Sequence, residues 1–355
     1  MKPIPRVLAA LLGLSSLLAA AQARDVVTFG YPQAIGLANA DMGFGMKLGI
    51  FAEENIELKL VALDGTARIV PQIASGGITA GFVHPDYMLS ALDKGQAPPV
   101  KYVYNWRRRS PYELTVMANS PVKTVADLKG KKVGVGALTW ANIPMVRAVT
   151  QEAGIKWQQE LTMVPVGVGP AGWRQLASGA VDAMAYPQSE NEKMSASGMA
   201  IRRLELPEKY RNMFTNGLLV SDQLIKSNPD LVRRLGRAIA KVTVACHANA
   251  EECLKGAWVV DPTLKPAPDK EAEWIKTYLP LQQANYRDML NFSGAQPLLG
   301  SYPDNGWQTH IAVMQASGTL TKASLPLDQI YTSAFIQDFN KFDRAAIEAR
   351  AKAAR

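Results

Sequence analysis

The chain has 355 residues, of which 48% are hydrophobic and 20% are charged. This balance excludes an intrinsically disordered chain, and the length leaves room for two domains. Lysine and arginine together number 39 against 31 acidic residues, which gives a net charge of +8. The basic residues are dispersed, and the single run at residues 107–109 is too short for a nucleic-acid-binding tail. We therefore expect no nucleic-acid partner.

The first 23 residues have the layout of a secretory signal peptide. Lys2 and Arg6 precede an almost wholly apolar stretch, residues 7–20, and small residues follow at Ala21 and Ala23. A membrane anchor is the alternative, but a spanning helix needs about 20 apolar residues. We therefore predict cleavage after Ala23 and a protein that lies in the periplasm.

The next feature in the chain is an internal repeat. Residues 72–82 and 175–185 are identical at five of eleven positions, with an offset of 103 residues. Each copy ends a helix at a glycine, Gly76 or Gly179, and continues as a short apolar strand. The repeat predicts two halves built in the same way.

The flanks of the repeat agree with this prediction. A strand at 26–29 corresponds to one at 132–135, and a helix-to-strand passage at 53–61 corresponds to one at 152–166. Each half therefore alternates strands and helices. Such alternation indicates parallel sheets with helices on both faces.

Two strands, 100–106 and 113–117, close the first half and open the second. A strand at 217–220 and a helix that begins at Asn228, with Pro229 in its first turn, lead into the last third. The remainder reads as helices, which we expect to pack on the first lobe.

Cys246 and Cys253 are the only cysteines. On one continuous helix their Cα atoms would be about 10 Å apart, too far for a disulfide. Residues 248–252 can break that helix, with Asn249 as the cap of the next one. A local disulfide and two buried thiols both remain open.

Five segments together resemble periplasmic binding proteins of the taurine, aliphatic-sulfonate and nitrate type, which serve ABC importers. They are residues 48–56, the Ala-Ser-Gly turn at 74–76, and residues 127–135, 177–183 and 227–232. The resemblance implies an α/β, two-lobed type II periplasmic binding protein fold, with two doubly wound sheets joined by a two-strand hinge. Receptors for thiamine-pyrimidine precursors belong to the same group, so the ligand does not transfer with the fold.

This resemblance implies a division of the chain and a function. After the signal peptide, 1–23, residues 24–108 and 213–355 would form lobe 1 and residues 109–212 lobe 2. We expect a monomeric substrate-binding protein that closes over a small organic anion, a sulfonate or carboxylate, and delivers it to an ABC permease in the inner membrane. A neutral heteroaromatic ligand and a sensory role are the alternatives.

Ligands of open α/β sheets lie beyond the carboxyl ends of the strands, so the loops there carry the candidate site. The alternative interpretation of these loops is that they are ordinary turns between strands and helices. For His84 the alternative is a helix-capping role, and for Arg107 it is a place on a solvated face of the hinge. The candidate ligand-binding residues are Tyr31, Gln33, His84, Asp86, Asn105, Trp106, Arg107, Thr139, Trp140, Tyr186 and Gln188.

An enzyme is the other class that we weighed. The three histidines, His84, His247 and His310, are scattered, and the sequence has no cysteine cluster. No nucleophile elbow, P-loop or nucleotide-binding glycine motif is present in the sequence. We therefore predict no catalytic residues, no metal and no cofactor.

Overall fold

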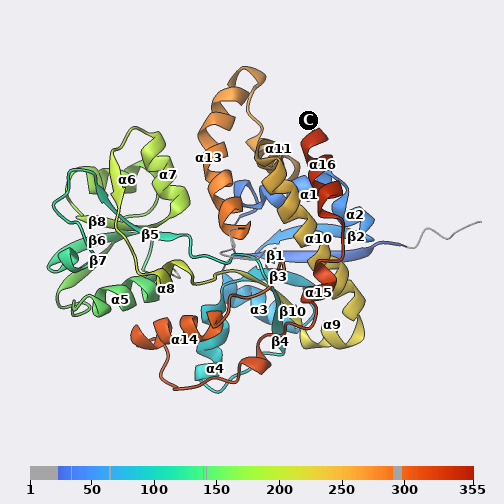
Figure 1. The fold of residues 1–355 in the computed structure, drawn as a ribbon, viewed down its shortest axis with the longest axis horizontal. Coiled ribbons are helices and arrows are strands. Elements are labelled where there is room, and N and C mark those ends of the chain that lie inside the picture. Colours follow the sequence, from blue (N-terminus) through green and yellow to red (C-terminus); the bar gives the residue numbers. More distant parts are fainter. Residues whose placement is uncertain (1–22, 33, 64, 139, 141, 291–297) are drawn as a thin grey trace, which may run out of the picture.

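The computed structural model describes residues 23–32, 34–63, 65–138, 140, 142–290 and 298–355. Two α/β lobes lie side by side, each around a five-stranded sheet (Figure 1). The strand orders, β2-β1-β3-β10-β4 and β7-β6-β8-β5-β9, follow the same pattern. The predicted two-lobed fold with a two-strand hinge is confirmed, while the predicted signal peptide lies outside the described residues.

The strands of the first sheet are β1 (Asp25–Tyr31), β2 (Ile56–Ala62), β3 (Ala80–Val83), β4 (Val100–Asn105) and β10 (Gly217–Ser221). Those of the second are β5 (Tyr112–Met117), β6 (Lys131–Val135), β7 (Leu161–Pro165), β8 (Ala183–Pro187) and β9 (Ile201–Arg203).

The sheets are mixed, which corrects the prediction of parallel sheets. β1 runs parallel to β2 and β3, and β6 parallel to β7 and β8. β10 and β5 are antiparallel to their neighbours. The reason is connectivity: these two strands follow the crossings between lobes, so each enters its sheet from the opposite direction.

The helices of the two repeated halves are α1 (Ala40–Lys47), α2 (Ile50–Glu53), α3 (Thr66–Ala74), α4 (Pro85–Asp93), α5 (Ile143–Glu152), α6 (Gly169–Ala177), α7 (Gln188–Ala196) and α8 (Glu208–Arg211). The last third supplies α9 (Asp222–Ser227), α10 (Pro229–Ala248), α11 (Ala250–Lys255), α12 (Ala257–Val260), α13 (Glu271–Leu290), α14 (Gly306–Ala316), α15 (Ile336–Phe339) and α16 (Arg344–Ala353).

The repeat has the predicted local structure. Gly76 after α3 and Gly179 after α6 have φ angles of 77° and 76°, the left-handed conformation that glycine adopts without strain. Each turn leads into a strand, β3 or β8, that pairs in parallel with the first strand of its half. The helix α10 also begins as predicted, since the Asn228 side chain accepts a 3.1 Å hydrogen bond from the Leu231 N–H.

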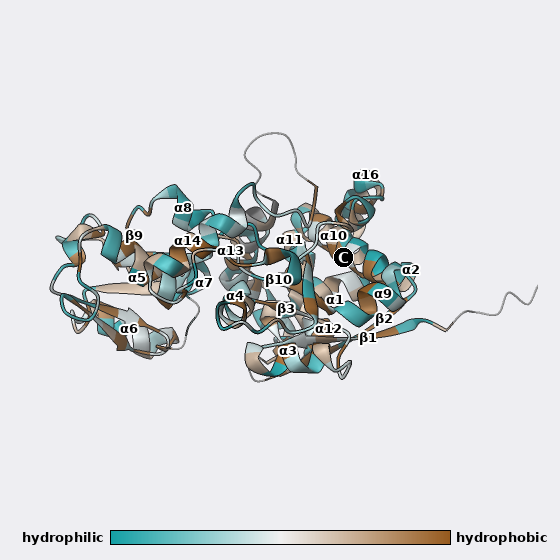
Figure 2. Cartoon of the chain, turned by 90° about the horizontal axis from the view of Figure 1, so that it is seen from below, coloured by the Kyte–Doolittle hydropathy of each residue, from teal (hydrophilic) through white to brown (hydrophobic). Residues whose placement is uncertain are grey.

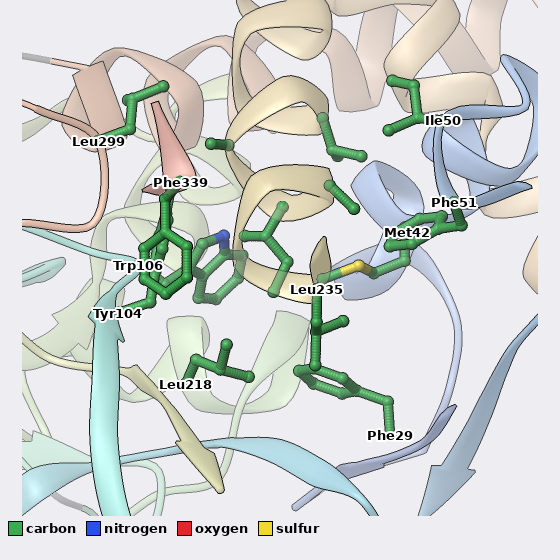
Figure 3. Close-up of a cluster of buried hydrophobic side chains, with 14 of the residues drawn as sticks. Phe29, Met42, Ile50, Phe51, Tyr104, Trp106, Leu218, Leu235, Leu299 and Phe339 are labelled. Atoms are coloured by element: carbon green, nitrogen blue, oxygen red, sulfur yellow. The ribbon is translucent and has the colours of Figure 1, made fainter. Parts of the chain in front are cut away.

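Each lobe buries apolar side chains on both faces of its sheet. On one face of the first sheet, α1 and α10 cover a large cluster, part of which Figure 3 shows with Phe29, Met42 and Leu235. On the other face a second cluster joins α3, α4 and α14. The central strands are mostly hydrophobic and the outer helices carry hydrophilic residues along part of their length (Figure 2). This two-sided burial is what a doubly wound sheet requires.

Two segments of the last third also reach lobe 2. α13 packs against α7 and α14 packs against α5, so the two helices meet lobe 2 from opposite sides (Figure 1). The expectation that these helices pack on the first lobe therefore describes only part of their contacts.

Cys246 and Cys253 form a disulfide, with Cα atoms 5.0 Å apart. This distance is reached because α10 ends at Ala248 and α11 starts afresh. Asn249 caps α11, its side chain accepting a 3.1 Å hydrogen bond from the Glu252 N–H. Within the described part of the chain, none of the helices combines the length and the apolar character that crossing a membrane demands.

Candidate functional site

A cavity of about 560 Å³ lies between the two lobes, a volume typical of small-molecule sites. Lobe 1, lobe 2, the crossings and α13 all contribute to its lining. The lining residues include Tyr31, Pro32, Leu37, Ala38, Phe82 and His84 from the first sheet side, Trp106, Arg107, Pro111, Thr215 and Asn216 from the crossings, Tyr112, Trp140, Pro187, Ser189 and Lys193 from the second lobe, and Leu281 and Gln282 from α13.

Aromatic rings form much of the wall. Phe82 at the end of β3 and Trp106 after β4 stack with their centroids 4.3 Å apart and their planes 9° from parallel. The Arg107 guanidinium carbon lies 4.7 Å from the centroid of the Trp106 ring, a cation–π geometry. This wall is apolar and carries a positive charge at one edge.

Trp140 brings an aromatic ring from the opposite lobe. It stands next to Gly136, the residue after β6, where a Cβ atom would come within 1.9 Å of the Trp140 ring. Only glycine at this strand end leaves the indole room to lie there. The centroid of the Trp140 ring is 6.1 Å from that of Tyr186, which is buried behind it.

The charged side chains in the lining are basic. Arg107 lies on the first crossing and Lys193 on α7, and among the described lining residues no side chain is a carboxylate. Lys193 is held by Glu190, whose Oε1 accepts a 2.6 Å hydrogen bond from the lysine Nζ. The cavity therefore favours a ligand with an anionic group.

Behind Tyr31 lies a group of buried polar side chains. The Tyr31 hydroxyl, Asn39 Nδ2 and Asp41 Oδ1 have no hydrogen-bond partner among the described residues. Burial raises the pKa of Asp41 to about 6, although hydrogen bonds from backbone N–H groups and the charge of Arg107 oppose the rise. Burial likewise raises the pKa of Tyr31 well above its ordinary value. Buried polar atoms without partners are costly, and a bound ligand or water can satisfy them.

A second polar cluster lies beside the cavity. Asp86 Oδ1 is 2.5 Å from His310 Nε2 and 3.1 Å from His84 Nδ1. Burial alone would raise the pKa of Asp86, but the two imidazoles reverse the effect and hold it well below its usual range. His84 is at the N-terminus of α4, yet its side chain makes no capping hydrogen bond.

The structure brings together Tyr31, His84, Trp106, Arg107 and Trp140 of the predicted residues in the lining of one cavity. Gln33 and Thr139 lie outside the described residues.

Four predicted residues have other contacts. Asp86 faces the two histidines, and the Asn105 Nδ2 group donates to the Ser301 carbonyl at 3.3 Å. The Tyr186 hydroxyl donates a 2.5 Å hydrogen bond to the Gly167 carbonyl. Gln188 begins α7 and its backbone N–H donates to the Pro111 carbonyl. None of these four is among the residues that line the cavity.

Sequence reasoning missed several lining residues. Thr215 and Asn216 form part of the second crossing, which the predicted two-strand hinge could have located. Lys193 stands on a polar helix without a distinguishing pattern, and Gln282 reaches the cavity only because α13 folds back over it. His310 joins the Asp86 cluster across 224 residues, for which no local pattern exists.

Two matching α/β lobes, joined by two crossings around a cavity, define the fold of periplasmic binding proteins. Among solved structures, the alkanesulfonate-binding protein SsuA from Xanthomonas axonopodis pv. citri, bound to MOPS, matches with a TM-score of 0.57 and 16% identity, over 88% of this chain and all of that chain. The desulfurization enzyme DSZB matches with a TM-score of 0.55 and 16% identity, over 89% and 99% of the two chains. These likenesses show the fold, which binding proteins and an enzyme share.

The chain belongs to the NMT1/THI5-like family, whose sequence profile matches residues 42–253. The predicted resemblance is confirmed for the family and for the periplasmic-binding-protein fold. A curated relative, the riboflavin-binding protein RibY from Chloroflexus aurantiacus, is 25% identical over 249 residues, covering 69% of this chain and 67% of RibY.

Proposed function

We propose that this protein is an extracytoplasmic solute-binding protein that captures a small organic anion between its lobes. The ligand would contact both lobes and the crossings, so its binding energy favours the closed arrangement. The closed protein, acting as a monomer, then delivers the solute to an ABC permease of the inner membrane. The signal-peptide layout of the first 23 residues supports an extracytoplasmic location.

The observation that carries this proposal is the composition of the cavity between the lobes. It combines aromatic rings from both lobes with Arg107 and Lys193, and the described lining has no carboxylate. Aromatic rings suit an apolar body, and a guanidinium suits the oxygens of a sulfonate or carboxylate. Nitrate fits less well, because it has no apolar body to cover the rings.

The first experiment is a thermal-shift screen of the purified chain, followed by calorimetry on the compounds that raise the melting temperature. The panel contains alkanesulfonates, taurine, aromatic carboxylates, nitrate, riboflavin and a pyrimidine. We expect organic sulfonates or carboxylates to raise the melting temperature and nitrate to leave it unchanged, because only a ligand that binds the native state stabilises it. If none of these solutes raises it, the proposal is wrong.

The variant Arg107→Gln tests the anion partner. Loss of one charge-assisted hydrogen bond, worth about 1.5–3 kcal/mol, should weaken the binding of the anion by roughly 10- to 150-fold. The matched control is Arg109→Gln, since Arg109 is in the same arginine run but is not among the lining residues. Equal losses in the two variants would contradict a direct role for Arg107.

A neutral heteroaromatic solute is the second candidate, and two observations favour it. RibY is named as a riboflavin-binding protein, and the cavity here offers Phe82, Trp106 and Trp140 as aromatic surfaces. A flavin would report its own binding, because stacking on tryptophan quenches flavin fluorescence. Quenching that persists in Arg107→Gln would favour this candidate over the organic anion.

A further inference from the structure

The cluster of His84, Asp86 and His310 contains two kinds of donor atom that transition-metal sites use, imidazole nitrogen and carboxylate oxygen. One carboxylate oxygen and two imidazole nitrogens lie within 4.8 Å of one another. Two histidines with one carboxylate form a common ligand set for Zn²⁺ and related divalent ions. The three side chains come from the loop after β3, the start of α4 and the distant α14, so only the folded chain brings them together.

Two imidazole nitrogens of the cluster, His84 Nδ1 and His310 Nδ1, are buried without a hydrogen-bond partner among the described residues. His84 Nδ1 is buried and 3.1 Å from Asp86 Oδ1, but it is not aligned for a hydrogen bond to that oxygen or to any other described atom. The Asp86 oxygen therefore does not satisfy both imidazoles, although both approach the same atom. An ion beside this oxygen would occupy the position on which the three donors converge.

The charge of the cluster also favours a bound cation. The Asp86 side chain is only 20% exposed and that of His310 is fully buried. Among the described residues, neither lysine nor arginine lies within salt-bridge distance of Asp86. A largely buried carboxylate needs a positive partner, and here that partner is either a proton on an imidazole or a bound cation.

The two distances from the Asp86 oxygen can be compared with those in a zinc site. Tetrahedral Zn²⁺ with ligands at about 2.0–2.2 Å places neighbouring donor atoms about 3.3 Å apart. The distance of 3.1 Å between His84 and Asp86 is already close to this value, while the 2.5 Å between Asp86 and His310 must lengthen. Rotation of the Asp86 carboxylate, the most exposed of the three groups, supplies that change.

We propose that His84, Asp86 and His310 bind one divalent transition-metal ion, with Zn²⁺ as the reference ion. Because His84 also lines the cavity between the lobes, the ion can reach the cluster from the cavity. The proposal concerns the metal alone and does not depend on which solute the cavity accepts.

The test uses the tag-free, full-length folded protein, stripped with a chelator and then titrated with Zn²⁺ and, in parallel, Co²⁺. We expect one equivalent of Zn²⁺ to remain bound after gel filtration, a rise in melting temperature, and the visible absorption bands of tetrahedral Co²⁺. Failure to retain either ion would overturn the proposal and would identify the cluster as a hydrogen-bonded network only.

Variants locate the ion. His84→Ala and Asp86→Asn should abolish retention of Zn²⁺, whereas His247→Ala should keep it, since His247 is exposed at the end of α10, outside the cluster. Retention of one equivalent in His84→Ala would place the ion elsewhere and refute the assignment. Circular dichroism confirms that each variant is folded.

A measurement on the unaltered protein covers the case in which a variant fails to fold. X-ray absorption at the zinc edge should show nitrogen and oxygen ligands at about 2.0–2.1 Å with the scattering pattern of two imidazoles. A spectrum with one imidazole or none would overturn the proposal.

Discussion

Replacement of Asp41 by asparagine should make the protein more stable at neutral pH. Asp41 lies in the first turn of α1, is 5% exposed and has one carboxylate oxygen without a hydrogen-bond partner among the described residues. Its pKa rises from 3.8 to about 6 on folding, mainly because burial disfavours the charged form. At about 1.36 kcal/mol for each tenfold change in proton affinity, the ionised group costs the folded state about 3 kcal/mol.

The sign of the pH dependence follows from which state binds the proton more tightly. Below pH 4 Asp41 is protonated in both states and costs nothing. As the pH rises from 4 to 6, the unfolded chain ionises first, so this group lowers stability progressively, and above pH 6 its cost is complete. The variant Asp41→Asn should therefore exceed the wild type by about 3 kcal/mol at pH 7.5, and the excess should vanish near pH 4.

Urea unfolding followed by circular dichroism at pH 4, 5, 6 and 7.5 measures the difference. Other titrating groups are common to both proteins and cancel in the comparison. The exposed Asp269→Asn serves as control and should stay within about 0.5 kcal/mol of the wild type throughout. A constant difference across this range, or a less stable variant at pH 7.5, would refute the assigned pKa. Residues that are kept for function often lower the stability of the folded protein, and a destabilising carboxylate next to a binding cavity fits that pattern.

Three further predictions concern the scaffold. Reduction of the Cys246–Cys253 disulfide releases a loop with a sequence separation of 7 and should lower the free energy of unfolding by about 2 kcal/mol; an unchanged urea midpoint would contradict it. Glu54→Gln should cost about 3–5 kcal/mol, since the 5% exposed Glu54 side chain pairs with Arg237 and Lys241. Glu57→Gln, in an exposed pair with Lys59, should cost less than about 1 kcal/mol, and equal losses would show that burial is not decisive. Folding lowers the pKa of Glu54, so the stability that its carboxylate contributes is present above about pH 4.5 and should be lost as the pH falls further. Acid unfolding of the wild type and of Glu54→Gln, compared side by side, measures this loss.

The sequence was sufficient to predict the architecture of the halves because their signals are local. The Ala-Ser-Gly turns ending at Gly76 and Gly179 fix where a helix stops and a strand begins, whatever surrounds them. The direction of a strand within its sheet has no such local signal, because the alternation of side chains along a strand is the same when it is read from either end. For that reason β10 and β5 were predicted as strands, while their antiparallel pairing was not.

The site shows the same division between local and tertiary information. Tyr31 and Trp140 were predictable because Tyr31 is the last residue of β1 and Trp140 lies in the loop after β6, and both strands end at the cavity. Gln282 and His310 were not, since they lie on α13 and α14, which return to the cavity and to its flanking cluster only through packing. The clustering of Asp86 with both histidines likewise required the folded chain, so the sequence predicted no metal where the structure brings together three side chains that could bind one.

The two crossings between the lobes are hydrogen-bonded to each other and line the cavity. The backbone N–H groups of Trp106 and Arg107 both approach the Asn216 carbonyl, at 3.0 and 3.3 Å, and the Thr215 N–H donates to the Arg107 carbonyl. Arg107, Thr215 and Asn216 also line the cavity, so the two crossings that join the lobes are part of its wall. If the lobes close over a solute as proposed, a solute that contacts Arg107 would act on the crossings directly as well as through the lobes. Its contacts with the crossings would then add to the free-energy difference between the open and closed forms.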